Sequence, residues 1–496
     1  MNADASVRTR FAPSPTGYVH LGSVRTALYN YLFAKQHQGC YVLRVEDTDQ
    51  SRKVQGALEN LIEVMDKLGL NHDEGPGCEG DHGPYLQSQR LALYSQKIKV
   101  LIESGHAYYC FCSSERLSNL REEQKSQNIA IGYDRKCRNL TETEIQSKLE
   151  ENTEYVIRLK VPDDQTITFE DLIRGPLEFD SNLIDDQVLI KSDGFPTYHF
   201  ANVVDDHEMQ ISHVIRGEEW VTSTPKHVLL YNAFAWTPPK FAHLPLILNP
   251  DRSKLSKRQG DVAVEDFLKA QFSEETLINY LALLGWSPGD DKEFFNLSEL
   301  IEQFQLEKVS KSGAVFDRDK LFWMNSQYIK NHLSEKRFLE LVKPFVNIDQ
   351  LKSWNTTVLD RVILTLRNQL DKPEDIQDLL SFFIRKPSTS VLKDGDCAPI
   401  LSLDTNATLF PFISSRIETL DTLSSDSLRE TTRSAQKELG IKGKALFMPL
   451  RVALTGAKSG PEVFVFAEGL GREECLERLR VAHQVHLELQ VESNAG

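Results

Sequence analysis

Two short segments carry residues that could handle phosphate groups. His20-Leu21-Gly22-Ser23 stands where a helix is predicted to begin, and a helix N-terminus offers unpaired N–H groups and a partial positive charge. Farther along, Lys254-Leu255-Ser256-Lys257-Arg258 forms a basic loop after a predicted strand, and such cations suit a polyphosphate that gains charge in a transition state. Taken singly, each segment is explained better by an ordinary surface loop. G-x-x-x-x-G-K-[ST] does not occur, and the one G-x-G-x-x-G, at Gly75–Gly80, is not followed directly by a predicted helix, so P-loop and dinucleotide sites lack their main support.

Alternating strands and helices are predicted around the first segment. Val7–Ala12 and Tyr41–Val45 have strand character, and apolar side chains recur at helical spacing from Val24 to Leu32 between them. A strand, a helix and a second strand joined by short loops begin a parallel α/β sheet. The same patterns predict helices at Gly56–Leu68, at Ser88–Ser104 and from Thr224-Pro225, and strands at Ile211–Arg216 and Leu244–Leu248.

Two other kinds of sequence complete the chain. From residue 106 the chain is richer in charged side chains and shows isolated strands, at Tyr155–Val161 and Thr166–Phe169, which predicts an α+β insertion. From Glu265 onward nearly every segment has helical period. We therefore predict a split α/β domain followed by helical domains.

Length and composition limit the class of protein. The 496 residues, 40% hydrophobic and 26% charged, are typical of a globular protein of several domains. No run of about 18 apolar residues predicts a membrane span, and the N-terminus lacks the apolar core of a secretory signal. Seven cysteines, an odd number, argue against a disulfide framework and for a reducing compartment. The net charge of −15 does not exclude nucleic acid, because a binding face is local.

Together the two basic segments resemble the HIGH and KMSKS signatures of class I aminoacyl-tRNA synthetases, in the same order and on the same kind of predicted fold. Ser23 replaces the second His of the first signature, and Leu255 and Arg258 replace the Met and the final Ser of the second. The resemblance runs from residue 7 to Met324 and returns at Gly443–Gly460, in a helical tail typical of bacterial members. The flanking segments are similar to the glutamyl-tRNA synthetase family in particular: RFAPSPTG from Arg10, RVEDTD from Arg44, PTYH from Pro196 and IRGEEW from Ile215.

The resemblance implies a Rossmann-type α/β parallel-sheet catalytic domain split by an α+β insertion and followed by all-α anticodon-binding domains. The expected boundaries are 1–105 for the first half of the catalytic domain, 106–190 for an inserted acceptor-binding subdomain, 191–250 for the second half, 251–332 for the KMSKS loop with a stem-contact helical domain, and 333–496 for the helical anticodon-binding region.

The implied activity is ATP-dependent attachment of L-glutamate to the 3′ end of tRNA(Glu) through a glutamyl-adenylate, which releases AMP and pyrophosphate. The enzyme would be a cytoplasmic monomer with Mg²⁺ bound mainly through the ATP phosphates. By resemblance, the catalytic residues would be His20, Lys254 and Lys257. ATP would be bound by His20, Gly22, Ser23, Glu219, Trp220, Lys254, Ser256 and Lys257. Glutamate would be bound by Arg10, Ala12, Ser14, Glu46, Tyr198, Asn202 and Arg216.

Residue chemistry supports part of this assignment. A substrate carboxylate needs a fixed cation, and Arg10 and Arg216 end predicted strands, where open α/β sheets bind ligands. By resemblance, Arg10 would read the glutamate side chain or its neighbourhood, Glu46 would pair with the substrate ammonium, and Ser14 and Tyr198 would supply hydrogen bonds. Tyr198 and Asn202 would share a face if their turn is helical. The plain alternative is that each arginine pairs with a carboxylate of a neighbouring helix.

The predicted insertion also holds three of the seven cysteines: Cys110, Cys112 and Cys137. Thiolates suit structural zinc, and relatives with zinc here use Cys-x-Cys followed by a third Cys and a nearby fourth ligand. Asn139 is a poor ligand, which leaves Tyr133 as the candidate. The alternative is three reduced, partly buried thiols.

A local basic stretch lies in the helical tail. Residues 427–460 carry seven Lys and Arg against two Glu, which indicates a tRNA-contacting face; a solvated helix surface is the alternative. Gln369 stands, in a rough alignment, where enzymes strict for glutamate tRNA tend to carry Arg, so charging of glutamine tRNA is a further hypothesis.

Four other functions were weighed. Glutaminyl-tRNA synthetases usually carry a Pro-Glu-Pro-Asn-Gly loop and β-barrel anticodon domains, whereas this chain has Pro13-Ser14-Pro15-Thr16-Gly17 and a helical tail. A truncated paralogue that charges a modified tRNA base lacks that tail, and a small-molecule nucleotidylyltransferase would leave it unexplained. A non-enzymatic RNA-binding protein would not need His20, Lys254 and Lys257.

Overall fold

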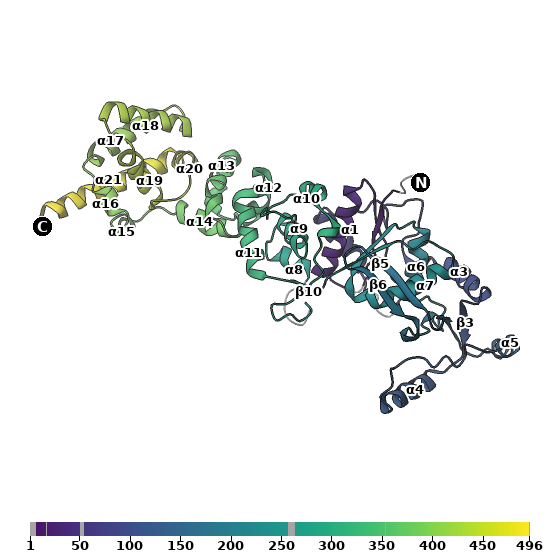
Figure 1. The fold of residues 1–496 in the computed structure, drawn as a ribbon. Helices are drawn as coiled ribbons and strands as arrows, with labels where there is room; N and C mark the ends of the chain where they lie inside the picture. Colours follow the sequence, from purple (N-terminus) through teal and green to yellow (C-terminus); the bar gives the residue numbers. More distant parts are fainter. Residues whose placement is uncertain (1–5, 16, 50–53, 256–262, 353, 496) are drawn as a thin grey trace. The chain divides into compact units, whose positions relative to one another are not determined.

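The computed structural model describes residues 6–15, 17–49, 54–255, 263–352 and 354–495. The chain divides into two compact units, Met1–Leu321 and Phe322–Gly496. In the described residues every strand belongs to the first unit and the second is helical (Figure 1). This confirms the predicted α/β domain followed by a helical region. None of the described helices is long and apolar enough to span a membrane.

The first unit begins with strands and helices in alternation. These are β1 (Arg8–Phe11), α1 (Leu21–Gln36), β2 (Cys40–Leu43), α2 (Ala57–Lys67) and α3 (Leu91–Glu103). The predicted insertion contributes β3 (Ala107–Cys110), α4 (Ser114–Ser126), α5 (Glu142–Glu150), β4 (Val156–Leu159), β5 (Thr166–Asp171), β6 (Gly175–Asp180) and β7 (Val188–Ile190). The α/β pattern then resumes with α6 (Tyr198–Glu208), β8 (His213–Gly217), α7 (Thr224–Ala233), β9 (Lys240–Leu244), β10 (Ile247–Leu248), α8 (Val264–Lys269), α9 (Glu274–Leu283), α10 (Leu297–Gln303) and β11 (Ala314–Val315).

Parallel strand pairs bring the two halves of this unit together. β1 pairs with β2, with Arg10 opposite Val42, and β8 pairs with β9, with Arg216 opposite His243. The start of β8 lies beside the start of β1, because the backbone N–H of Ser212 donates to the carbonyl of Arg8 at 3.0 Å. Arg10 and Arg216 therefore lie toward the carboxyl ends of neighbouring strands, where α/β sheets bind ligands.

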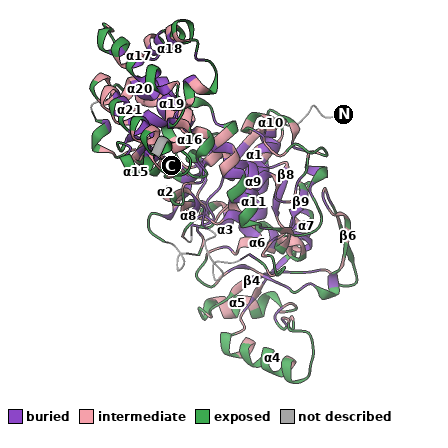
Figure 2. Cartoon of the chain, turned by 90° about the vertical axis from the view of Figure 1, so that its left-hand side faces the viewer, coloured by how far each residue is buried: buried purple, intermediate pink, exposed green. Residues whose placement is uncertain are grey.

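The insertion is less separate than the sequence suggests. β5 and β6 form an antiparallel hairpin, and Asp171, the last residue of β5, pairs in parallel with Phe241 of β9. The hairpin thus extends one sheet in the order β6-β5-β9-β8. By contrast, α4 and α5 bury no residue, and Figure 2 shows them largely exposed, beyond β4.

One predicted strand is wrong. Leu244–Leu248 is not continuous, because β9 ends at Leu244 and β10 begins at Ile247. Pro245 lies between them and has no N–H to donate to a ladder. β10 pairs instead with β11.

The core of the first unit surrounds α1. The helical spacing from Val24 to Leu32 is confirmed, but burial extends around most of the helix and includes Arg25 and Asn30, as expected for a helix enclosed by other elements. The side chain of Asn30 donates to the carbonyls of Thr26 and Ile215 at 2.8 and 2.9 Å. α1 is therefore fixed against the sheet by polar contacts as well as by apolar packing, which holds its N-terminus at a defined place.

The second unit begins within α11 (Arg318–Gln327), where the boundary between the two units lies. Its further helices are α12 (Glu335–Val342), α13 (Thr356–Leu366), α14 (Asp375–Ile384), α15 (Thr389–Leu392), α16 (Ala398–Leu401), α17 (Asn406–Thr419), α18 (Ser425–Leu439), α19 (Lys444–Thr455), α20 (Val463–Leu470) and α21 (Arg472–Ala495). The helices from α15 to α21 pack around an apolar core that includes Leu409, Leu450 and Leu479.

Candidate active site

Two buried arginines meet one carboxylate at the carboxyl ends of β1 and β2. The β1–β2 register places Arg10 and Arg44 on the same face of the sheet, where like charges would repel. Asp206 on α6 lies between them, and its Oδ1 accepts from Arg10 Nε at 3.0 Å and from Arg44 at 2.6 Å. Burial opposes ionisation of Asp206, but Arg10 and Arg44 hold its pKa below the usual value. The alternative stated for Arg10, that it pairs with a carboxylate of a neighbouring helix, is therefore also found in the structure.

That ion pair does not use all of Arg10. Only its Nε is engaged in the contacts of the described residues, so both terminal NH₂ groups remain for a ligand. Arg44 is fully buried and also donates to Glu46 at 3.3 Å. Asp206, which is also bonded to Arg44, therefore holds Arg10 through its Nε and leaves the terminal nitrogens of Arg10 without a contact among the described residues.

Glu46 is a carboxylate held in an unfavourable environment. It is 9% exposed, and burial raises its pKa to about 7 in spite of Arg44 and Arg10. Its backbone N–H donates to the carbonyl of Pro13 at 3.0 Å, which places it beside the loop after β1. A buried carboxylate of this kind is stabilised by a ligand cation.

Arg216 is a buried cation surrounded by neutral acceptors. Its Nε donates to His243 Nε2 at 3.0 Å, and its NH2 donates to Thr224 Oγ1 at 2.8 Å. Its NH1 donates to the Tyr198 hydroxyl and to His227 Nδ1, both at 3.3 Å. Within the described part of the chain no carboxylate forms an ion pair with it, and burial lowers its pKa. An unpaired buried charge is costly, so this site favours an anionic ligand.

Tyr198 connects these groups. It begins α6, and its hydroxyl oxygen accepts from Arg216 and from Asn202 Nδ2, the latter at 3.2 Å across one helical turn. Burial raises its pKa, and its hydroxyl lies within electrostatic range of Arg216, Glu46 and Arg10. The described contacts leave its proton without an acceptor, so the hydroxyl can donate to a ligand.

The remaining residues predicted to bind glutamate border this group. Ala12 and Ser14 lie in the loop after β1, with Ala12 half-buried and Ser14 exposed. The loop runs beside residues 44–46 through the Arg44–Phe11 and Glu46–Pro13 backbone bonds. The structure therefore places the predicted amino-acid site in one region, built from β1, β2, α6 and β8.

The first phosphate-binding segment begins α1. His20 is its N-cap, and the imidazole Nδ1 accepts from the backbone N–H of Gly22 at 3.0 Å. Since Nδ1 is an acceptor in this bond, Nε2 carries the proton of the neutral ring. Gly22 and Ser23 are half-buried in the first turn, where the helix end favours negative charge.

The second segment begins after β10, and the described chain beyond it returns to this helix end at Ala263. Lys254 pairs with Leu248 in a tight turn after β10, and Ala263 pairs with His20, with the N–H of Val264 donating to the carbonyl of Val19 at 2.9 Å. Lys254 is exposed and thus available to an anion. Ser256 and Lys257, and the neighbouring Arg258, lie outside the described residues.

Residues 218–220 connect the two halves of the site. The ring of Trp220 lies 4.2 Å from that of Tyr198, and the carboxylate of Glu219 lies 3.8 Å from the ammonium of Lys254. The amino-acid and phosphate regions are therefore contiguous. The arrangement offers cations for two anionic groups, a carboxylate for an ammonium, and a helix N-terminus for phosphate. None of the described side chains named above is placed as a covalent nucleophile.

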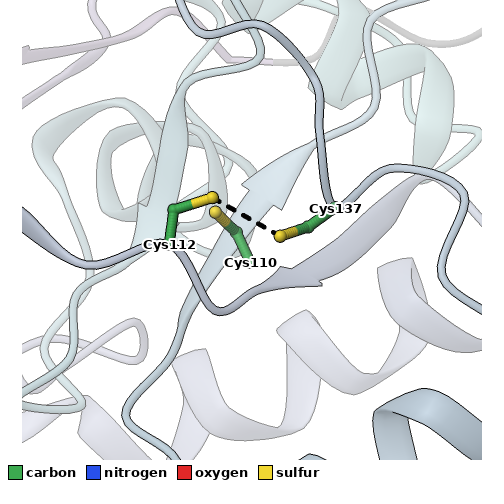
Figure 3. A group of neighbouring side chains, drawn as sticks. All are labelled: Cys110, Cys112 and Cys137. Atoms are coloured by element: carbon green, nitrogen blue, oxygen red, sulfur yellow. Dashed lines mark hydrogen bonds between the residues drawn. The ribbon is translucent and has the colours of Figure 1, made fainter. Parts of the chain in front are cut away.

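The three cysteines of the insertion form a second candidate site, in which the sulfurs of Cys110, Cys112 and Cys137 turn toward one another (Figure 3). The Cys112 and Cys137 sulfurs are 3.5 Å apart, and the Tyr133 hydroxyl lies 3.3 and 3.5 Å from Cys110 and Cys112. A hydrogen bond with Cys137, opposed by burial, lowers the pKa of Cys110 to about 4. The cluster could hold a metal ion.

Distances support zinc at this cluster. Bonds of about 2.3 Å to sulfur and about 2.0 Å to oxygen in a tetrahedron put two sulfurs about 3.8 Å apart and a sulfur and an oxygen about 3.5 Å apart. The sulfurs lie within 4.8 Å of one another, and the Tyr133 oxygen is close to the distance of a fourth ligand. Donor set and spacing both fit.

Sequence reasoning missed the charged and polar groups that hold these residues in place. The sequence patterns assign no role to Arg44, which begins the RVEDTD segment. They also assign none to Asp205, Asp206, Asp171 and His243. A usable signal was the Arg-x-Glu spacing of Arg44 and Glu46, which puts two charges on the same face of a buried strand and so demands partners.

Comparison with known proteins agrees with this geometry. Residues 6–323 match the family described as tRNA synthetases class I (E and Q), catalytic domain, and residues 337–483 match an anticodon binding domain. A glutamate–tRNA ligase of Clostridioides difficile strain 630 is 48% identical, covering 96% of this chain and 98% of the relative. One from Chlorobium luteolum is 47% identical, covering 96% and 97%. The crystal structure of a glutamate tRNA ligase from Elizabethkingia meningosepticum in complex with its amino acid is similar at a TM-score of 0.79 and 36% identity, covering 97% and 99%.

Proposed function

The chain belongs to the glutamate–tRNA ligases, class I aminoacyl-tRNA synthetases, and from this premise we propose how its residues attach L-glutamate to tRNA(Glu). The observation that carries the proposal is Arg216, a buried guanidinium that has only neutral acceptors among the described residues and lies against Tyr198. A bound carboxylate would supply the missing negative charge. Arg216 would therefore bind the glutamate side chain, with Tyr198 donating to the same group and Asn202 holding Tyr198.

The other charges would orient the amino acid. Glu46 would pair with its ammonium, the terminal nitrogens of Arg10 would contact its carboxylates, and Ala12 and Ser14 would line the open side. A site built to satisfy a carboxylate leaves Arg216 poorly paired when glutamine binds, so discrimination follows from hydrogen-bonding chemistry without an editing step.

In the first half-reaction, an oxygen of the glutamate α-carboxylate attacks the α-phosphorus of ATP. The new O–P bond forms glutamyl-adenylate while the bond to the β-phosphate oxygen breaks and releases pyrophosphate. His20 Nε2–H, the helix start at Gly22 and Ser23, and Lys254 would stabilise the phosphoryl charge. Trp220 and Glu219 would border the nucleotide. Mg²⁺ supplies further charge neutralisation when ATP brings it. Ser256 and Lys257 keep the roles predicted from the sequence.

In the second half-reaction, a ribose hydroxyl of the terminal adenosine of tRNA attacks the acyl carbon and AMP leaves. Residues 106–190 would bind the acceptor end, 251–332 would contact the stem and 333–496 the anticodon. On α18 and just after it, Arg433, Lys437, Lys442 and Lys444 are exposed and form no ion pair within the described residues. These four form the most available part of the predicted basic face. We expect a cytoplasmic monomer.

Aminoacylation with purified tRNAs tests the proposal. Glutamate and tRNA(Glu) should give glutamyl-tRNA and pyrophosphate, while glutamine should not be activated. Adding tRNA(Gln) tests the Gln369 hypothesis, since Gln369 is exposed and carries no charge to reject a different anticodon. Absence of charging with tRNA(Glu) would contradict the proposed function.

The pKa of Glu46 gives a pH-dependence. Pairing with the substrate ammonium needs Glu46 ionised, and burial raises its pKa to about 7. We expect kcat/KM for glutamate to fall about tenfold per pH unit below 7 and to level off above it, since this profile reports the free enzyme. At saturating glutamate the bound ammonium keeps Glu46 ionised, so kcat should stay flat to lower pH. Glu46→Gln should lower kcat/KM and flatten its profile; an unchanged profile in that variant would remove Glu46 from the role.

We also propose that Cys110, Cys112, Cys137 and Tyr133 hold a structural zinc. Thiolate donors suit zinc, and zinc binding stabilises the fold around the ion. Metal analysis of protein purified without chelator should give about one zinc per chain, and Cys137→Ala should lower both this content and the melting temperature. Metal-free protein of unchanged stability would support three reduced thiols instead.

A further inference from the structure

We propose that Asp171 and His243 are positioning residues for amino-acid recognition: they orient Arg216 so that its guanidinium meets the substrate carboxylate. The inference rests on the proposed function, in which Arg216 reads that carboxylate. It assigns part of glutamate specificity to a residue of the inserted segment, because Asp171 ends β5.

The contact between Arg216 and His243 fixes the protonation of the imidazole. Arginine only donates hydrogen bonds, so His243 Nε2, 3.0 Å from Arg216 Nε, must be unprotonated. The ring proton is then on Nδ1, which lies 2.6 Å from Asp171 Oδ2. Both side chains are fully buried. Burial lowers the pKa of His243 to about 4 despite the bond to Asp171, in keeping with a neutral ring.

Asp171 is well placed to hold that tautomer. Its Oδ1 accepts from the backbone N–H groups of Ile173 and Arg174 at 3.0 and 2.9 Å, and its Oδ2 also accepts from the backbone N–H of His243 at 3.1 Å. These bonds fix the carboxylate relative to both β5 and β9. Hydrogen bonds and the His243 ring keep its pKa below the usual value in spite of burial, so it is an ionised acceptor.

The other acceptors around Arg216 are also committed. His227 Nδ1 accepts from Arg216 while its Nε2 lies 3.0 Å from His199 Nδ1. The Thr224 hydroxyl lies 3.0 Å from the carbonyl of Trp220 and 3.1 Å from His243 Nε2, and can donate to either acceptor. Four of the five N–H groups of Arg216 are thereby oriented. Among these acceptors, His243 is the one whose tautomer is set by a buried charge, that of Asp171. An isosteric change at Asp171 can therefore turn His243 Nε2 from an acceptor into a donor.

Asp171→Asn is that change. Its carbonyl oxygen can still accept from Ile173 and Arg174, which preserves the turn. Its NH₂ group faces His243 Nδ1 and favours the opposite tautomer, and it can no longer accept from the backbone N–H of His243. The Nε2–H of His243 would then point at the Nε–H of Arg216, and the hydrogen bond between the two side chains would be lost. We expect the KM for glutamate to rise about ten- to hundredfold, as for loss of a hydrogen bond to a charged group, with the KM for ATP unchanged and glutamate-to-glutamine discrimination reduced.

Two substitutions at His243 separate positioning from packing. In His243→Gln an amide oxygen can take the place of Nε2 and accept from Arg216, whereas in His243→Asn the amide reaches only the position of Nδ1 and Asp171. We expect His243→Asn to match Asp171→Asn, and His243→Gln to keep the glutamate KM within about threefold of the wild type because the bond to the charged group is retained. His213→Asn is the control, since His213 is also buried but opens β8 opposite Lys240, at the other end of the strands.

All variants should be assayed by pyrophosphate exchange with tRNA present, and their melting temperatures measured. If the wild type does not activate glutamate, the proposed function fails. If it does, the positioning role is overturned by any of three results: an unchanged glutamate KM in Asp171→Asn, equal effects of His243→Gln and His243→Asn, or changes in ATP and glutamate KM that merely follow the loss of melting temperature. Selective loss in Asp171→Asn and His243→Asn, with rescue in His243→Gln, supports it.

Discussion

Replacing Arg216 by methionine is expected to lower kcat/KM for glutamate by about 10²- to 10³-fold, the range found when one member of a buried charge pair is removed. The substitution keeps the unbranched stem and takes away the guanidinium. The side-chain carboxylate of the substrate would then enter a buried site in which only Tyr198 and the terminal nitrogens of Arg10 remain as proposed donors. The loss should appear mainly in the KM for glutamate, because the charge is present in the ground state and the transition state alike.

Arg216→Lys sharpens this experiment. Lysine keeps the positive charge but cannot donate to His243, Thr224 and Tyr198 in the fixed planar arrangement that arginine provides. We expect it to recover less than a tenth of the lost kcat/KM, since geometry and charge are both required.

The matched control is Arg8→Met. Like Arg216 in β8, Arg8 is a strand arginine; it lies in β1 and makes two bonds of 2.8 Å to Glu74. It lies at the amino end of its strand, away from the proposed site. It should cost stability and leave the glutamate KM unaltered. Equal glutamate kinetics in Arg216→Met and in the wild type would exclude Arg216 as the reader of the side chain.

The strand ends that carry Arg10 and Arg216 could be predicted from the sequence because they depend on local patterns. Alternation around residues 7–12 and 211–216 marks buried strands, and parallel strands in an α/β domain bind ligands at their carboxyl ends. Which groups these arginines contact was beyond such patterns. Asp206 lies 196 residues from Arg10 in the chain, and nothing local links the two.

Asp205 and Asp206 illustrate the physical limit. Neighbouring residues on a helix point about 100° apart, so the two carboxylates cannot share the same set of partners. In the structure Asp206 bonds to Arg10 and Arg44. Asp205 accepts from Arg90 at 2.7 Å and from Tyr94 at 2.8 Å, and lies 3.9 Å from Arg44. The choice depends on the rotation of α6 about its axis, which packing of the whole unit decides.

The hairpin of β5 and β6 shows the same limit for topology. A charged segment with isolated strands predicts an insertion, and it is one, but the pairing of Asp171 with Phe241 joins residues 70 positions apart. A sheet edge accepts any strand with matching register, so sequence alone did not show that the insertion supplies a carboxylate beneath the proposed amino-acid site.

His20→Asn is expected to slow adenylate formation by about 10²- to 10³-fold, the cost of removing one donor aimed at developing charge. Two roles of His20 can be separated, one observed in the structure and one proposed. Nδ1 caps α1 by accepting from Gly22 N–H at 3.0 Å, and Nε2–H is the group proposed to meet phosphate. Asparagine is a favourable N-cap residue whose oxygen can replace Nδ1, and it lacks an equivalent of Nε2.

His20→Ala completes the pair. It removes both groups, so it should slow adenylate formation to the same extent and also destabilise the fold by about 0.5–2 kcal/mol through loss of the cap. Single-turnover adenylate formation and thermal unfolding, measured on both variants, separate the two tasks. Because kcat should fall while the KM for glutamate stays near that of the wild type, the loss would be assigned to the transition state. A His20→Asn enzyme that forms adenylate at the wild-type rate would reduce His20 to a helix cap, and stabilisation of the phosphoryl charge would then have to come from Lys254, Lys257 and the backbone at Gly22.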